Sequence, residues 1–284
     1  MMSLEVCTTS EELSFKREDW RQAGMKIGLV PTMGALHEGH LSLIETMSAH
    51  ADKIIVSLFV NPTQFAEGED FDAYPRTTDD DLRKLRSTKA EIVFMPDASE
   101  IYGDVVTASL KAGNLAEGLE SATRPHFFSG VVTVVHKLFK LCQPDAAIFG
   151  EKDYQQLLVI KQMVSDHDMG IEVLQGATLR ETDGLAMSSR NAYLNDRQRK
   201  TAIHLNKIMR DLCNDYHSAQ ELNRLPSLEE EAIKKLQETG FTEIDYLTVR
   251  DADTLQPPNT ETKKLRLLAA VRLGEIRLID NCAV

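Results

Sequence analysis

Short apolar runs alternate with amphipathic stretches through the first half of the chain. Residues 26–30 and 53–60 are almost continuously apolar, which predicts buried strands, and residues 39–51 carry apolar side chains at helical spacing. A strand, a helix and a second strand within about thirty residues are typical of a βαβ unit. The two strands are therefore expected to run parallel.

The same alternation continues to residue 175. Further helices are predicted at 78–90, 131–141 and 153–167, and further strands at 91–95, 145–149 and 171–175. Repeated βα units of this kind predict an α/β fold with a doubly wound parallel sheet.

An acidic triplet, Asp79, Asp80 and Asp81, falls in the first turn of the helix predicted at 78–90. The helix dipole favours carboxylates at this position, and they can also cap the helix, so we interpret the triplet as a helix start. A metal-binding cluster is the alternative.

Beyond residue 178 the pattern changes to helices followed by strands. Helices are predicted at 196–217 and 227–239, and strands at 243–249, 265–272 and 275–279. The last two strands should form a hairpin through Gly274, and the stretch 256–262, which contains two prolines, should be a loop. We therefore predict two domains, one at 1–178 and a smaller α+β domain at 179–284.

The composition is that of a globular protein, with 42% hydrophobic and 27% charged residues among 284. The 32 Lys and Arg residues against 44 Asp and Glu residues give a formal net charge of −12. This surplus repels a phosphate backbone, so nucleic-acid binding is not expected. A nucleotide can still bind where Lys, His and backbone N–H groups gather locally.

The four cysteines, Cys7, Cys142, Cys213 and Cys282, are scattered and form no C-x-x-C pair. Neither a zinc site nor a disulfide framework is predicted, and reduced thiols in a reducing compartment are expected. No apolar run approaches the length of a membrane span, and residues 1–12 lack the features of a signal peptide. A cytoplasmic location is the expectation.

The strongest local signal is GLVPTMGALHEGH at 28–40, where the first strand meets the first helix. In an open α/β sheet, ligands bind at the carboxyl ends of the strands, where a helix N-terminus offers N–H groups to phosphate. His37 and His40 lie three residues apart, so both can face a phosphate chain and donate hydrogen bonds to it. A metal site would need a third ligand, and the motif is not H-E-x-x-H. Capping or packing histidines remain an alternative.

A second polar segment follows the strand at 53–60. Pro62 ends that strand, and the amides of Asn61 and Gln64 can hydrogen-bond hydroxyl and carboxylate groups. A plain turn is the alternative.

A third segment follows the strand at 145–149. Gly150 opens a turn, Lys152 offers a cation for phosphate, and Asp153 can hold a ribose hydroxyl or a water. Gln156, about one helical turn further on, can face the same cleft.

A fourth polar segment, DGLAMSSRN at 183–191, lies near the predicted domain boundary. Its two hydroxyls and its guanidinium suit a mobile clamp over a triphosphate, although a helix-capping loop is also possible. No Ser-His-Asp order, G-x-S-x-G elbow or G-x-G-x-x-G accompanies these segments. A site rich in phosphate-binding groups and poor in nucleophiles favours adenylyl transfer.

The set of motifs resembles the adenylylating nucleotidyltransferases with an H-x-G-H box, and among them the pantoate–β-alanine ligase (pantothenate synthetase) family. The matching segments are PTMGALHEGH (31–40), FVNPTQF (59–65), YPRT (74–77), QPDAAIFGEKDYQQL (143–157), DGLAMSSRN (183–191) and RLIDN (277–281). The resemblance implies a ligase with a Rossmann-type domain, a smaller C-terminal lid domain and a homodimer. It also implies that pantoate and ATP, with Mg²⁺, form pantoyl adenylate and pyrophosphate, and that β-alanine then releases pantothenate and AMP.

Position by position, the resemblance makes His40 the proton donor and places His37 and Lys152 at the phosphates, so these three are the candidate catalytic residues. The candidate ATP-binding residues are Met33, Gly34, His37, His40, Gly150, Glu151, Lys152, Asp153, Leu179, Met187, Ser188, Ser189 and Arg190. The candidates for binding pantoate and β-alanine are Gln64, Gln156 and Asn61. No residue is assigned to the metal.

One segment departs from the family pattern. The family reads R-P-G-H-F-x-G-V where this chain has RPHFFSGV at 124–131, so the glycine is absent and the histidine lies one position earlier, at His126. No role is assigned to His126.

Two other functions compete with the ligase. A nucleotidyltransferase of the same superfamily would leave the nucleotide on its product, whereas the ligase forms AMP only with both pantoate and β-alanine. A nucleotide sensor without activity would have no need of His37, His40, Lys152, Ser188 and Arg190 together.

Overall fold

The computed structural model describes residues 4–66, 68, 69, 71–219 and 221–284. Contacts divide the chain into two compact units, Met1–Glu151 with Gln155–Ala177, and Lys152–Tyr154 with Thr178–Val284. The sequence predicted two domains, at 1–178 and 179–284. Contacts alone do not test whether each domain folds independently, so this division stays a prediction.

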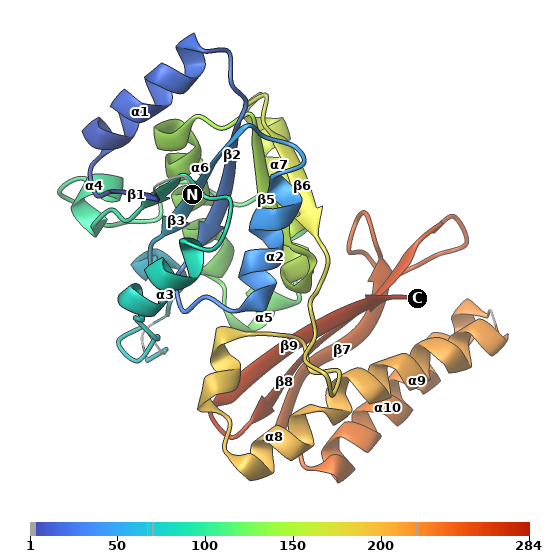
Figure 1. The fold of residues 1–284 in the computed structure, drawn as a ribbon. Helices are drawn as coiled ribbons and strands as arrows, with labels where there is room; N and C mark the ends of the chain where they lie inside the picture. The colour runs from blue at the N-terminus through green and yellow to red at the C-terminus, as the bar shows by residue number, and fades with distance from the viewer. Residues whose placement is uncertain (1–3, 67, 70, 220) are drawn as a thin grey trace. The chain divides into compact units, whose positions relative to one another are not determined.

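The first unit is built on a six-stranded parallel sheet (Figure 1). Its order is β1-β4-β3-β2-β5-β6. The strands are β1 (Glu5–Cys7), β2 (Ile27–Thr32), β3 (Lys53–Leu58), β4 (Ile92–Phe94), β5 (Ala146–Gly150) and β6 (Glu172–Gly176). From β2 the chain continues to β3 and β4 on one side of the sheet, and later to β5 and β6 on the other. The predicted doubly wound sheet is confirmed, and its topological switch point lies between β2 and β5.

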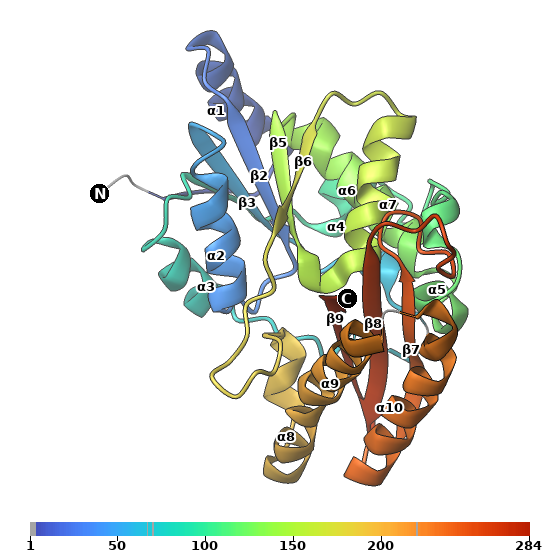
Figure 2. The same ribbon diagram turned by 90° about the vertical axis from the view of Figure 1, so that its right-hand side faces the viewer.

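Helices cover both faces of this sheet (Figures 1 and 2). On one face α2 (Glu38–Met47) and α3 (Thr78–Leu85) pack through residues such as Ile44 and Leu85 against Val30, Val56 and Ile148. On the other face lie α1 (Ser10–Gln22), α6 (Phe127–Cys142) and α7 (Tyr154–Asp166). Each face therefore has its own buried apolar layer, which explains why the strands are apolar on both sides.

The sequence pattern missed the first strand and helix, together with two short helices, α4 (Ala98–Tyr102) and α5 (Glu120–Thr123). Only Leu13 of α1 is buried, so the helix has almost no apolar periodicity to detect. A start signal was nevertheless present, because Thr9 and Glu12 form a capping box at its N-terminus. The helix predicted at 78–90 is shorter and ends at Leu85.

The second unit contains the antiparallel sheet β7-β8-β9. Its elements are α8 (Asp196–Ala202), α9 (His204–Ala219), α10 (Leu225–Thr239), β7 (Glu243–Asp251), β8 (Leu265–Leu273) and β9 (Ile276–Ala283). Gly274 has a positive φ of 61° and turns β8 into β9, so the predicted hairpin is confirmed, as is the smaller α+β architecture.

The single helix predicted at 196–217 is wrong, since α8 and α9 are separate. Ile203 lies between them with φ −61° and ψ −23° and keeps helical backbone angles. The apolar spacing therefore continues across the break, and the sequence pattern carries no sign of it.

No helix in the described part of the chain is long and apolar enough to cross a membrane.

Candidate active site

The carboxyl ends of three neighbouring strands bring the polar segments of the first unit to one edge of the sheet. Thr32 at the end of β2 lies opposite Leu58 of β3, and β2 also pairs with β5, with Leu29 opposite Ala147. Residues 33–40 follow β2, residues 61–64 come shortly after β3, and Gly150 and Glu151 lie at the end of β5. These segments of the first unit therefore lie at the carboxyl ends of neighbouring parallel strands, beside the switch point between β2 and β5.

His37 and His40 form a reciprocal cap at the start of α2. The Nδ1 atom of His37 accepts from the Gly39 N–H at 3.1 Å, and Nδ1 of His40 accepts from the His37 N–H at 3.3 Å. The ring centroids are 4.1 Å apart. Because both Nδ1 atoms act as acceptors, the neutral rings carry their proton on Nε2. Capping and phosphate donation are thus compatible, since the first uses Nδ1 and the second uses Nε2–H.

The loop before this helix has a strained backbone. Gly34 and Ala35 both have positive φ, 83° and 49°. A Cβ atom on Gly34 would be 3.2 Å from the Asp81 carboxylate, so the loop passes close to that group. A non-glycine residue in this region costs free energy unless neighbouring contacts hold it there.

Asp81 supplies those contacts. Its side chain is buried, with 2% exposed, and its two oxygens accept from Ala35 N–H at 2.9 Å and Leu36 N–H at 2.7 Å. Sequence reasoning assigned Asp81 to the first turn of α3, and it lies there, but its carboxylate binds the loop of residues 34–36 instead of capping its own helix. No group of three His, Cys, Asp or Glu residues that could hold a metal ion is found among the described residues.

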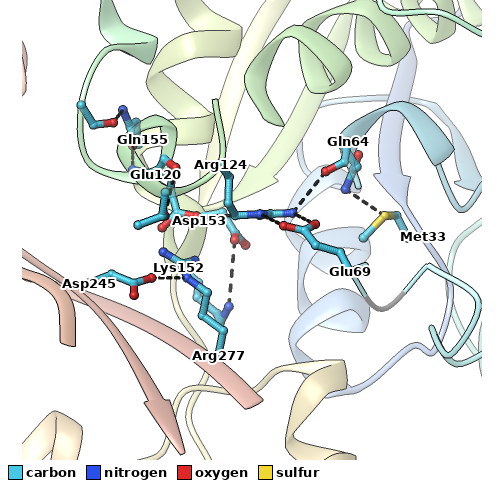
Figure 3. Close-up of polar contacts among 12 residues, drawn as sticks. Met33, Gln64, Glu69, Glu120, Arg124, Lys152, Asp153, Gln155, Asp245 and Arg277 are labelled. Carbon is cyan, nitrogen blue, oxygen red and sulfur yellow. Dashed lines mark hydrogen bonds and ion pairs between the residues drawn. The ribbon is translucent and has the colours of Figure 1, made fainter. Parts of the chain in front are cut away.

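Gln64 links the nucleotide motif to the predicted acid-binding segment (Figure 3). Its Nε2 donates to the sulfur of Met33 at 3.0 Å, and its Oε1 accepts from Nδ2 of Asn61 at 3.1 Å. Asn61 is 1% exposed; its Oδ1 accepts from the hydroxyl of Tyr102 and from the N–H and hydroxyl of Thr63, and its Nδ2 also donates to the carbonyl of Gly130. Asn61 therefore orients Gln64 from behind.

Arg124, which sequence reasoning did not single out, holds the same segment in place (Figure 3). Its guanidinium forms two hydrogen bonds of 2.7 Å to Glu69, and a third of 3.1 Å to the backbone carbonyl of Gln64. It also lies 4.1 Å from the ring centroid of Phe127. This is the segment that departs from the family pattern, and α6 nevertheless begins at Phe127, after His126.

A close backbone contact fixes the distance between α6 and the 3₁₀ turn η1 (Pro62–Gln64). A Cβ atom on Gly130 would lie 2.2 Å from the Thr63 carbonyl oxygen, so only glycine fits without a shift of the backbone.

The two glutamines at the start of α7 have different environments. Gln155 is 3% exposed, accepts from Glu120 N–H at 3.1 Å and donates to Leu115 O at 3.1 Å. Gln156, the predicted ligand, is partly exposed. The structure thus assigns packing to Gln155 and leaves Gln156 accessible.

Lys152 and Asp153 lie in the 3₁₀ turn η3 (Glu151–Asp153), and both belong to the second unit. The Lys152 backbone carbonyl accepts from Nδ2 of Asn281 at 2.7 Å. The Lys152 side chain is 18% exposed, and its ammonium lies 4.0 Å from the Asp153 carboxylate. Asn281 belongs to the RLIDN segment, whose Arg277 pairs with the buried Asp245 at 2.6 Å (Figure 3).

The serine-rich loop is a capped turn. Ser188 accepts from the Arg190 N–H at 3.3 Å and begins η4 (Ser189–Tyr193), while Met187 N–H donates to Leu179 O at 2.9 Å. The ion pair between Arg180 and Asp280, at 2.6 Å, anchors this turn to β9. The capping alternative is thus present in the structure, and the mobile clamp stays a prediction.

The candidate residues divide between the two units. The first unit holds Met33, Gly34, His37, His40, Asn61, Gln64, Gly150, Glu151 and Gln156, and the second holds Lys152, Asp153, Leu179, Met187, Ser188, Ser189 and Arg190. Their assignment to one site stays a prediction.

Comparisons with known proteins agree over the whole chain. The family model for pantoate-beta-alanine ligase matches residues 5–283. The pantothenate synthetase of Hyphomonas neptunium is 45% identical over 290 residues and covers 99% of this chain and 97% of its own. That of Maricaulis maris is 47% identical over 280 residues and covers 97% of this chain and 95% of its own.

Two solved structures share the fold. The pantothenate synthetase of Thermus thermophilus has a TM-score of 0.90 and 37% identity, covering 98% of both chains. The pantoate-beta-alanine ligase of Francisella tularensis, crystallised with beta-gamma ATP and beta-alanine, has a TM-score of 0.81 and 33% identity, covering 99% of this chain and 98% of its own.

Asp81→Asn should loosen the loop, because an amide oxygen can accept one of the two N–H groups while its NH₂ faces the other. We expect the free energy of unfolding to fall by about 1–3 kcal/mol, with faster amide exchange at Ala35 and Leu36. Chemical denaturation and hydrogen exchange measure both. The exposed Asp79→Asn is the matched control and should change stability by less than about 0.5 kcal/mol. Equal effects of the two substitutions would contradict the role of Asp81.

Proposed function

Because the chain belongs to the pantoate–β-alanine ligase family, we propose that the segments after β2, β3 and β5 form its active site. The protein catalyses the ATP-dependent condensation of pantoate with β-alanine, which forms an amide bond. Within the first unit, the observation that best supports the proposed location is the contact of Gln64 with Met33. It joins the acid-binding segment to the histidine-containing loop.

On the nucleotide side, we propose that His37 and His40 donate from Nε2 to the phosphate oxygens of ATP. The carboxylate of pantoate is already ionised near pH 7, so its attack on the α-phosphorus requires no base. The protein instead has to position two anions and stabilise the charge that grows on the phosphate oxygens. The reciprocal cap supports this role because it fixes both rings and sets their tautomer.

On the acid side, the bond that Gln64 donates to Met33 supports a role in substrate binding. A thioether sulfur is a weak acceptor, so a hydroxyl or carboxylate oxygen of pantoate can replace it with a gain in hydrogen-bond strength. Asn61 keeps the amide oriented during this exchange. We propose that Gln156 provides a second amide for pantoate, and that Gln64 also contacts β-alanine.

For the remaining ATP contacts, the proposal follows the family pattern. Lys152 would neutralise phosphate charge, and the hydroxyls and guanidinium of residues 188–190 would bind the triphosphate. Leu179 would contact the adenine through its backbone, as the family pattern implies for this position.

We further propose that Mg²⁺ enters with ATP and is held mainly by phosphate oxygens. The described residues offer no three-residue metal cluster, and Mg²⁺ commonly uses substrate phosphates, water and one or two carboxylates. Asp153, with a side chain 44% exposed, is a candidate for one of these. Bound there, the ion would neutralise part of the triphosphate charge. A cytoplasmic location is proposed as well, and four free cysteines are compatible with a reducing compartment.

We propose that the chain forms a homodimer through the extended segment 104–108. Val105 and Val106 are 68% and 46% exposed, and residues 104–108 make no backbone hydrogen bond with the described part of the chain. Such a segment can pair antiparallel with its copy about a two-fold axis.

Light scattering after size exclusion should give twice the chain mass for the wild type. Val106→Asp should give a single chain mass, because it places like charges across the pairing. Phe15→Asp, which alters a side chain 68% exposed on α1, is the matched control and should stay dimeric. Loss of the dimer in Phe15→Asp alone would place the interface at α1 instead.

The proposed chemistry is tested by measuring AMP formed from ATP, pantoate and β-alanine, with each omitted in turn. We expect AMP in stoichiometric amount with pantothenate, and none when pantoate is absent. A nucleotidyltransferase would leave the nucleotide on its product, and a sensor would bind ATP without turnover. Either result would contradict the ligase.

His40→Ala and Lys152→Ala should each lower the single-turnover rate of pantoyl adenylate formation by at least ~10²-fold, the scale of losing one donor to the transition state. Quenched-flow measurement of pyrophosphate release reports this step. His50→Ala, an exposed histidine beyond the end of α2, is the control and should retain the wild-type rate. A near wild-type rate in His40→Ala or Lys152→Ala would contradict the catalytic role proposed for that residue.

A further inference from the structure

Two cysteines of the second unit meet although they are far apart in the chain. Cys213 lies in α9 and Cys282 near the end of β9, 69 positions later, and their sulfur atoms are 3.4 Å apart. Cys7 and Cys142, in contrast, are both buried in the apolar layer on one face of the first unit's sheet. The pair is not used in the proposed reaction.

We propose that Cys213 and Cys282 form a modification site that a hydroperoxide converts reversibly into an intrachain disulfide. The Cys213 thiolate attacks a peroxide oxygen, which breaks the O–O bond and yields a sulfenic acid and, after protonation, one water. The Cys282 thiol then displaces the sulfenic oxygen as a second water and forms the S–S bond. The two thiols lose two electrons and two protons, and one H₂O₂ is reduced to two H₂O.

The geometry suits this bond. A disulfide is about 2.05 Å long, so the sulfur atoms must approach by roughly 1.4 Å. Cys282 can provide that movement, because β9 is an edge strand that pairs only with β8 in its three-stranded sheet. Cys282 is also partly exposed, whereas Cys213 is 6% exposed, so oxidant reaches the pair from the side of the strand.

The environment favours Cys213 as the attacking sulfur. A hydrogen bond from Cys282 lowers the pKa of Cys213, although burial opposes this. The same hydrogen bond, followed by burial and by the charge of the neighbouring Asp280, raises the pKa of Cys282, while Arg266 opposes the increase. Between the two sulfurs, Cys213 is therefore the one that ionises more readily, and Cys282 is left as the resolving thiol. Burial instead raises the pKa of Cys142 to about 12, which makes that thiol unreactive.

The cross-link should also stabilise the second unit. It would join α9 to β9 and close a long loop. A disulfide stabilises mainly by restricting the unfolded chain, and more so when the loop is long. It lies one residue from Asn281, whose amide binds the Lys152 carbonyl, and so also restrains the strand end that makes this contact.

The test uses the full-length chain treated with an equimolar amount of hydrogen peroxide. Mass spectrometry of the intact protein should show a loss of two hydrogens, and peptide mapping without reductant should join the peptides that contain Cys213 and Cys282. The thermal midpoint should rise by at least ~4 °C. Dithiothreitol should reverse both changes. Cys7 and Cys142 should stay available to alkylation after unfolding.

Cys213→Ser and Cys282→Ser serve as controls, because each should abolish the two-hydrogen loss while it leaves AMP formation intact before oxidation. Sulfinic acid at Cys282 in the wild type, a disulfide between two chains, or an oxidised pair without a higher thermal midpoint would overturn the proposal. Because the readouts are mass and stability, failure of the proposed ligase chemistry would not affect them.

Discussion

The fold positions the loop that carries His37 and His40 by means of one buried carboxylate, that of Asp81. Asp81 comes from a helix that begins some forty residues after the loop it binds, and it satisfies two consecutive N–H groups of a backbone with two positive φ angles. Without it, the strain of this conformation would have to be relieved by another loop path. The His37–His40 cap begins directly after this loop, so the orientation of both imidazoles depends on the loop path that Asp81 holds.

The parallel direction of the strands brings the candidate segments of the first unit together. Because all six strands run in the same direction, the segments that leave β2, β3 and β5 emerge together, and polar residues distant in sequence become neighbours. Side chains behind the candidate ligands then restrict their freedom. Asn61 binds the oxygen of the Gln64 amide, and Arg124 binds its backbone carbonyl. This reduces the entropy lost when a substrate binds.

Much of this could be predicted from the sequence because the relevant signals are local. Apolar periodicity revealed most helices and strands, and the position of His37 and His40 after a strand indicated a phosphate site. The supporting shell could not be predicted, because Asp81 and Ala35 are 46 positions apart and Arg124 and Glu69 are 55 apart. The sequence also does not tell which of two adjacent glutamines is buried. Gln155 is buried and Gln156 is accessible because α7 turns Gln155 toward the interior of the first unit. The helix predicted at 196–217 failed for a related reason, since the break at Ile203 disturbs hydrogen bonding without disturbing periodicity.

The absence of a side chain at Gly130 has a consequence for how this site can change. Helix α6 touches the backbone of η1 directly, so the separation between the helix and Gln64 equals a backbone contact distance and is already at its minimum. Any residue larger than glycine at position 130 would push Gln64 away from α6, and no residue is smaller than glycine. Adaptation to an acid of different length therefore has to come from the other residues that contact the substrate. Helix α6 thus fixes the position of the Gln64 backbone, and with it the amide that we propose binds the acid.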